Sequence, residues 1–117
     1  MFAAILETDD PQRLYTALSV VVSKAADGEP ARVLLGFGAL PALLRDPLVA
    51  GPAVIESERE PFARTLAELR DTALELCDVW ACAAAAQATG VDTAPLAGVI
   101  SMPQFVREVA GARLILI

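Results

Sequence analysis

The stretch from Leu69 to Gly90 reads LRDTALELCDVWACAAAAQATG, and its pattern decides the fold class. It begins inside an amphipathic helix, whose apolar positions start upstream at Phe62 and recur at helical spacing. Asp78 to Cys82 then form a short apolar run of β-prone residues, which is typical of a buried strand. The alanine run that follows favours a helix, and Gly90 supplies its stop. A helix, a strand and a helix in direct succession indicate an α/β domain.

The same alternation continues on both sides of this stretch. Three further apolar runs predict buried strands, namely Phe2 to Leu6, Arg32 to Phe37 and Ala112 to Ile117. Two helices carry start signals, which are Asp10-Pro11 in the first and the capping box Ser101 to Gln104 in the last. Strands that alternate with helices predict a mainly parallel sheet of four to five strands, with helices on both faces. The 117 residues fit one domain spanning 1–117.

The middle of the chain has the weakest pattern. Leu40 to Arg45 predict one or two helical turns, but prolines and a glycine punctuate the residues up to 52. The charge cluster Glu56 to Glu60 predicts a solvated loop, followed by a helix that restarts at Pro61.

Composition excludes several classes of function. The chain has no histidine, which removes the Ser-His-Asp triad, the Cys-His dyad and histidine-ligated zinc. Its two cysteines are too few for a disulfide framework or a four-cysteine metal site. A formal charge of -6 makes nucleic acid or an anionic membrane surface an unsuitable partner. We therefore expect no metal, no cofactor and no nucleic acid.

Location and assembly follow from the distribution of the apolar residues. The N-terminal segment MFAAILETDD has no basic region ahead of its apolar run, so we expect no signal peptide. The longest apolar stretch, Val33 to Leu44, falls well short of the ~20 residues that a membrane span needs. These features predict a cytoplasmic protein without a membrane contact. Because 56% of this short chain is apolar, we also expect an oligomer that covers part of the surplus.

The residues that follow each predicted strand are the candidates for a functional site, because parallel sheets bind ligands at the carboxyl ends of their strands. These residues are Glu7 to Asp10 after the first strand, Gly36 to Gly38 after the second, and Cys82 after the third. We expect Thr8, Phe37 and Gly38 to rim one pocket with Cys82, where they shape it and supply hydrogen bonds.

Two other kinds of site can be weighed at these positions. Gly36 and Gly38 resemble the opening of a dinucleotide fingerprint, with Glu56 at about the distance of a ribose contact. Pro41 stands where the third glycine belongs, so we prefer a tight turn with close backbone approach. The acidic pair after the first strand lacks the strand-end aspartate and lysine that a phosphoreceiver site needs, which excludes that site.

The two cysteines differ in their surroundings. Cys77 falls on the apolar stripe of its helix, which predicts a core residue. Cys82 stands at a strand end just before a helix, where the helix dipole and free N–H groups stabilise a thiolate. It is equally consistent with a small packing residue. If the segment between them is extended, their α-carbons lie on the order of 13–16 Å apart, beyond the ~7 Å limit for a disulfide.

The segment Leu69 to Gly90 resembles the corresponding stretch of the DsrE/DsrF-like family, in which a helix leads into a strand that ends in a cysteine, followed by a small-residue helix. The TusD-like sulfur-relay branch is closest around Val79 to Ala85, and Leu96 to Ile117 is similar to the family's C-terminal half. The resemblance implies a three-layer α/β/α sandwich and cytoplasmic homo- or hetero-oligomers of related subunits, often trimers or hexamers. It also implies that Cys82 carries a persulfide between a sulfur-donor protein and an acceptor protein.

Two alternatives remain beside this sulfur carrier. One is a non-catalytic oligomeric or binding module that keeps the family fold while Cys82 merely packs. The other is a small flavodoxin-like protein that binds a nucleotide or flavin.

Overall fold

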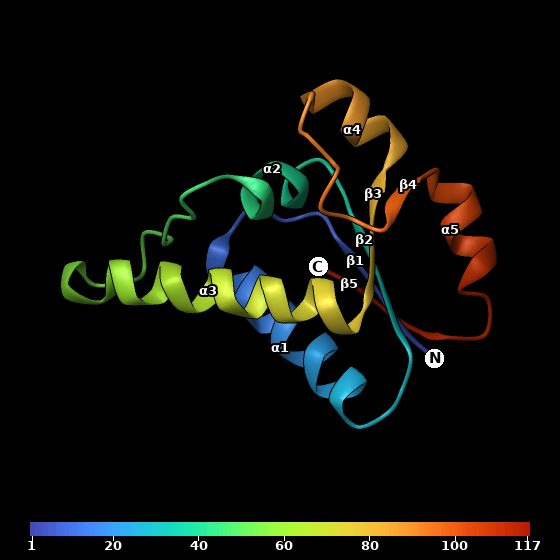
Figure 1. The fold of residues 1–117 in the computed structure, drawn as a ribbon, viewed down its shortest axis with the longest axis horizontal. Helices are drawn as coiled ribbons and strands as arrows, with labels where there is room; N and C mark the ends of the chain where they lie inside the picture. Colours follow the sequence, from blue (N-terminus) through green and yellow to red (C-terminus); the bar gives the residue numbers. More distant parts are fainter.

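The computed structural model describes residues 1–117 and contains one five-stranded sheet. The strands are β1 (Phe2–Leu6), β2 (Ala31–Leu35), β3 (Asp78–Cys82), β4 (Gly98–Ile100) and β5 (Arg113–Leu116). They lie in the order β4-β3-β2-β1-β5, and every neighbouring pair is parallel (Figure 1). The predicted α/β class and the parallel arrangement are confirmed.

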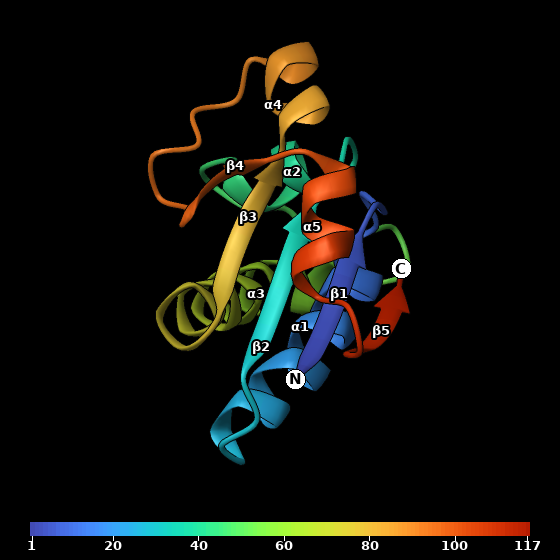
Figure 2. The ribbon, with the colours of Figure 1, turned by 90° about the vertical axis from the view of Figure 1, so that its right-hand side faces the viewer.

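Five helices accompany the sheet: α1 (Pro11–Ala26), α2 (Ala39–Leu44), α3 (Glu56–Leu76), α4 (Ala83–Thr89) and α5 (Met102–Glu108). The helices α1 and α3 pack together on one face of the sheet, whereas α5 lies on the other face (Figures 1 and 2). The short helices α2 and α4 lie at the carboxyl end of the strands. Helices on both faces of one sheet form the expected three-layer α/β/α sandwich.

The first helix shows why the local sequence signals work. The Asp10 carboxylate accepts a hydrogen bond from the main-chain amide of Gln12 at 3.0 Å, which satisfies one of the free donors at the start of α1. Pro11 occupies the first turn, where its missing N–H costs nothing. The buried side chains of α1 recur at helical spacing and form one apolar stripe: Leu14, Ala17, Leu18 and Val21.

The start of α3 corrects a prediction. Residues Glu56 to Glu60 are helical rather than a loop, and Pro61 lies inside the helix. A proline near the helix start removes one main-chain hydrogen bond, while two glutamates in the first turn interact favourably with the helix dipole. Arg59 fixes this turn further, because its guanidinium donates to three carbonyl oxygens of residues 50–54 at 2.9–3.3 Å.

Two strands also differ from the expectation. The strand β4 was not predicted, because three residues that begin with a glycine carry too little pattern. The strand β5 was predicted to be buried, yet it forms the outer edge of the sheet with three of its four residues exposed. An apolar run alone does not distinguish a central strand from an apolar edge strand.

The core is one cluster of 27 buried hydrophobic residues built around β1, β2 and β3. Every residue of β1 is buried. None of the buried residues of the chain is polar or charged. None of the helices combines the length and the apolar character required to cross a membrane.

Candidate functional site

The carboxyl ends of β1, β2 and β3 carry the candidate residues to one edge of the sheet. Leu6 pairs in register with Leu35, and Leu35 pairs with Ala81. The loop after β1, the loop after β2 and Cys82 therefore lie at about the same level along neighbouring strands.

The loops after β1 and β2 are in direct contact. A Cβ atom on Gly38 would collide with the carbonyl oxygen of Glu7, so only glycine permits this approach. The Phe37 amide donates to the Glu7 carboxylate at 3.1 Å, and the Phe37 ring is exposed. The Thr8 hydroxyl oxygen accepts a hydrogen bond from the Asp10 amide at 3.1 Å. The structure thus brings Thr8, Phe37 and Gly38 together, and close packing of main chain explains the glycine without a nucleotide.

Glu7 is a candidate residue at this edge, because it directly follows β1. Because α1 and α5 cover opposite faces, the chain changes face between β1 and β5, and such a point is where open parallel sheets bind ligands. Glu7 lies there, with its carboxylate against Gly36. The amides of Glu7 and Thr8 both donate to the carbonyl oxygen of Ile117, at 2.6 and 3.2 Å. Its place directly after the strand predicts a position at this edge, whereas its contact with Gly36 leaves no signal in the sequence.

Cys82 occupies the predicted place but not the predicted surroundings. It is the last residue of β3 and the residue that precedes α4, yet it is only 6% exposed. No main-chain amide of α4 donates to its thiol. The expectation of an open thiol facing the start of a helix is therefore wrong. Cys82 pairs with Ile100 of the unpredicted strand β4 and belongs to the hydrophobic cluster.

Cys77 is a core residue, as predicted, although it lies just beyond the last turn of α3 rather than within it. Burial raises the pKa of the Cys77 thiol, and the negative charge of Asp78 raises that pKa further. Both cysteines are free, and they stand at opposite ends of β3.

Two cavities flank the segment that connects α2 with α3, and Cys82 lines neither. The larger, of about 490 Å³, lies between residues 46–50 and α3, and the other, of about 420 Å³, lies beside the start of α1. Three arginines line the larger cavity, but each already has partners. Arg59 donates to carbonyl oxygens of the segment, Arg64 pairs with a glutamate at 3.3 Å, and Arg70 pairs with an aspartate at 3.0 Å. Arg59 holds the connecting segment in place, and Arg70 also donates to the carbonyl oxygen of Leu43 at 2.9 Å, whereas the partner of Arg64 lies within α3 itself.

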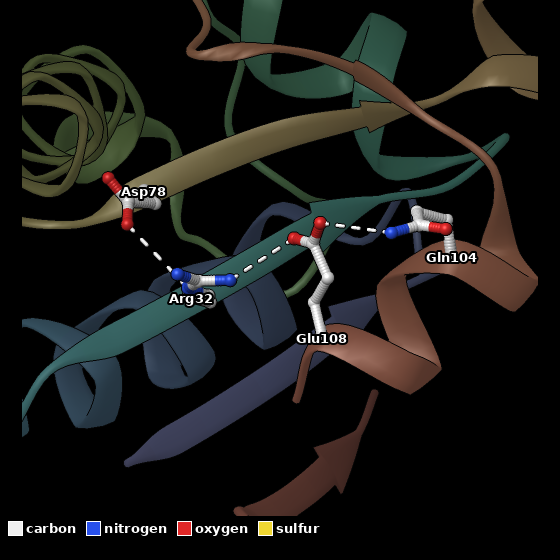
Figure 3. Close-up of polar contacts among 4 residues, drawn as sticks. All are labelled: Arg32, Asp78, Gln104 and Glu108. Carbon is white, nitrogen blue, oxygen red and sulfur yellow. Dashed lines mark hydrogen bonds and ion pairs between the residues drawn. The ribbon is translucent and has the colours of Figure 1, made fainter. Parts of the chain in front are cut away.

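A polar network at the opposite, amino end of the sheet fastens α5 to the strands (Figure 3). Arg32 on β2 donates to the Glu108 carboxylate at 3.2 Å, and its Nε lies 3.7 Å from the Asp78 carboxylate. The Gln104 amide group donates to the same glutamate at 3.1 Å. These side chains remain partly open to solvent, so the network positions α5 and contributes modestly to stability.

Comparison with known proteins adds no assignment. No protein-family model matches the chain, and no curated protein matches it. The position of Cys82, the contacts of the edge loops and the arrangement of the sheet are the features on which a function can be argued.

Proposed function

We propose that this chain is a member of the DsrE/DsrF-like family that carries sulfur as a persulfide on Cys82. One observation carries the proposal: a cysteine ends β3 at the carboxyl edge of a parallel sheet and leads directly into α4, a helix of small residues. The other parallel strands bring the loops with Thr8, Phe37 and Gly38 to that edge. In this proposal those residues shape the surroundings of the sulfur.

The chemistry is an exchange between thiols and a persulfide. The Cys82 thiolate attacks the outer sulfur of a donor persulfide, the S–S bond of the donor breaks, and the donor departs as a thiolate. Cys82 then holds the sulfur as Cys82–S–SH. An acceptor thiolate attacks that terminal sulfur and regenerates the Cys82 thiolate. Each step forms one bond to sulfur and breaks another, so the transfer needs no added oxidant or reductant, and no histidine or metal.

The burial of Cys82 requires that the edge open before a donor can reach it. The segment that opens is α4, which stands beyond the end of the sheet with its connection to β4 (Figure 2). A seven-residue helix that follows Cys82 directly can swing by rotation of the main chain at that residue. The proposal therefore includes a transfer rate that depends on opening as well as on thiolate chemistry.

Intact mass spectrometry tests the carrier directly. The folded protein, Cys82→Ser and Cys77→Ser are incubated with inorganic polysulfide, and each mass is read before and after reduction. We expect one reducible sulfur adduct in the wild type and in Cys77→Ser, and none in Cys82→Ser. Alkylation in urea serves as the control, because both thiols should then react in the wild type. A folded wild type without an adduct, or an adduct that survives in Cys82→Ser, contradicts the carrier.

A second function is favoured by one observation, the low exposure of Cys82 within the hydrophobic cluster. In that case the chain is a non-catalytic oligomeric module, and Cys82 is a small packing residue. The same experiment separates the two functions, because the module predicts no adduct while the protein is folded.

For either function we propose an assembly in the cytoplasm, as a homo-oligomer such as a trimer or hexamer, or with related subunits. The support is the number of large apolar side chains left on the surface, among them three on α5 and β5: Val106, Leu114 and Leu116. The carrier function adds a donor protein and an acceptor protein as transient partners.

A further inference from the structure

The outer edge of β5 combines exposed leucines with unpaired main-chain groups. Leu114 and Leu116 are 48% and 70% exposed. The amides of Arg113 and Ile117 donate to carbonyl oxygens on the β1 side, so the odd-numbered residues of β5 supply the hydrogen bonds to β1. The N–H and C=O groups of Leu114 and Leu116 point the other way, out of the sheet. This edge can accept another strand.

Both leucines project from the sheet face that α5 covers. Leu114 and Arg32 each lie opposite Ala3 in the register of the sheet, so their side chains share one face. Arg32 contacts Glu108 of α5, which identifies that face as the one on which α5 lies. Leu116 follows two residues after Leu114 and projects to the same side.

The side of α5 that lies toward β5 extends this apolar surface. Phe105 is buried against the sheet, and Gln104 and Glu108 lie on the flank that meets Arg32. At 3.6 residues per turn, Val106 lies on the opposite flank of α5 from Gln104 and Glu108. Those two residues face Arg32 on β2, so the strand order β2-β1-β5 places Val106 on the β5 side. Val106 is exposed, and with Leu114 and Leu116 it forms what we call the β5 patch.

We propose that the β5 patch binds a second copy of this chain, with β5 antiparallel to the partner's β5 about a two-fold axis at Ile115. This inference rests on the assembly proposed above, in which a two-fold contact either forms a dimer or joins two trimers into a hexamer, and it is independent of the chemistry of Cys82. With that axis, Leu114 pairs with the partner's Leu116 and Leu116 pairs with the partner's Leu114, so the outward main-chain groups of both strands are satisfied. The two sheets become one sheet of ten strands, and the four leucines lie together between the two α5 helices.

Charge and area both favour a second copy as the occupant. Each chain carries a net charge of -6, but the β5 patch carries none, and Arg113 of β5 projects from the other face and is neutralised by Glu29 of its own chain. The edge carries no lysine or proline, with which many exposed edge strands resist pairing, and its one charged residue, Arg113, is already paired. The apolar side chains and the strand edge of both copies together bury on the order of 1,000 Å², the lower end of the range for specific interfaces. We therefore expect a reversible contact, because a small interface leaves little surplus over the cost of association.

Sedimentation over a range of protein concentrations tests the contact. We expect the wild type to pass from a 12.3 kDa monomer to a dimer, or to a larger even-numbered assembly built on it, as concentration rises. Leu114→Lys should raise the dissociation constant at least about ten-fold, because it places a charge in the apolar contact. The matched control is Val99→Lys, since Val99 is also 48% exposed but lies on β4 at the opposite edge of the sheet. A monomeric wild type, or equal effects of the two substitutions, overturns the proposal.

A cross-link tests the register. In a background without native cysteines (Cys77→Ser with Cys82→Ser), Ile115→Cys should form a disulfide-linked dimer on mild oxidation, because residue 115 meets its own counterpart at the axis. Leu116→Cys should link poorly, because it meets the partner's Leu114. A dimer that links at 116 and not at 115 overturns the strand pairing. Polysulfide labelling of Leu114→Lys keeps the two proposals distinct: an unchanged adduct with a lost dimer leaves the carrier standing and supports the interface.

Discussion

Replacing Gly36 with alanine should destabilise the carboxyl edge of the sheet through one identifiable contact. A Cβ atom at this position would collide with the Glu7 carboxylate, which the Phe37 amide holds in place at 3.1 Å. The carboxylate must swing away and lose that hydrogen bond. We expect Gly36→Ala to lower the free energy of unfolding by about 1–2 kcal/mol, the sum expected for a lost hydrogen bond and mild overpacking.

The same substitution should cost much less in the background Glu7→Ala. The obstacle is the end of a flexible side chain, and with it gone the space for the new methyl group is free. Alanine also restricts the unfolded chain, which contributes about 0.4–1 kcal/mol in favour of folding where the backbone tolerates it. Gly38→Ala is the control, because its added Cβ meets the main chain of Glu7 rather than the side chain. It should cost about 1–3 kcal/mol in both backgrounds.

Urea denaturation of the six chains, followed by Trp80 fluorescence, measures these differences. The six are the wild type, Gly36→Ala and Gly38→Ala, each with and without Glu7→Ala. The reasoning is refuted if Gly36→Ala costs the same with and without the Glu7 side chain, or if Glu7→Ala rescues Gly38→Ala.

Three further predictions concern charges and thiols elsewhere in the fold. Glu108→Gln removes the charge that Arg32 contacts at 3.2 Å and should lower the free energy of unfolding by no more than about 1 kcal/mol. Because salt screens the pair, this difference should vanish near 1 M salt, and a difference that persists there would contradict the prediction. Cys77 is the one thiol left in Cys82→Ser, and burial raises its pKa, so iodoacetamide should alkylate this variant slowly at pH 8. Alkylation at the rate of a free thiol would refute this prediction. A hydrogen bond from Arg113 lowers the pKa of Glu29, so this pair stabilises the fold above the ordinary glutamate pKa, and the contribution is lost as pH falls through the lowered value. Urea midpoints between about pH 6 and pH 3 should therefore fall less steeply in Arg113→Gln, and identical slopes would exclude the effect.

The parts of the fold that the sequence predicts well are those set by local chemistry. The cap at Asp10, the strand Phe2–Leu6 and the strand Asp78–Cys82 all lie where the pattern places them. The errors arise where tertiary contacts decide. The first turn of α3 is fixed by hydrogen bonds from Arg59 to a preceding segment, and β4 exists because β3 offers it an edge. Neither contact leaves a periodic signal in the chain.

The candidate site shows the same difference between features that local sequence sets and features that tertiary contacts set. The rule that ligands meet the carboxyl ends of parallel strands placed Thr8, Gly38 and Cys82 on one edge without knowledge of the strand order. The exposure of Cys82 did not follow from that rule, because exposure depends on β4 and on the packing around it. The contact of Glu7 with Gly36 was likewise hidden, since it joins two loops that are distant in sequence.

The placement of the two thiols at opposite ends of β3 has a consequence for the fate of any sulfur held on Cys82. The strand β3 separates Cys82 from Cys77, so Cys77 cannot attack the persulfide and release its sulfur by forming a disulfide within the chain. The lifetime of the persulfide then depends on the concentration of a second protein and on how often that protein meets Cys82. Delivery of the sulfur is therefore a bimolecular reaction.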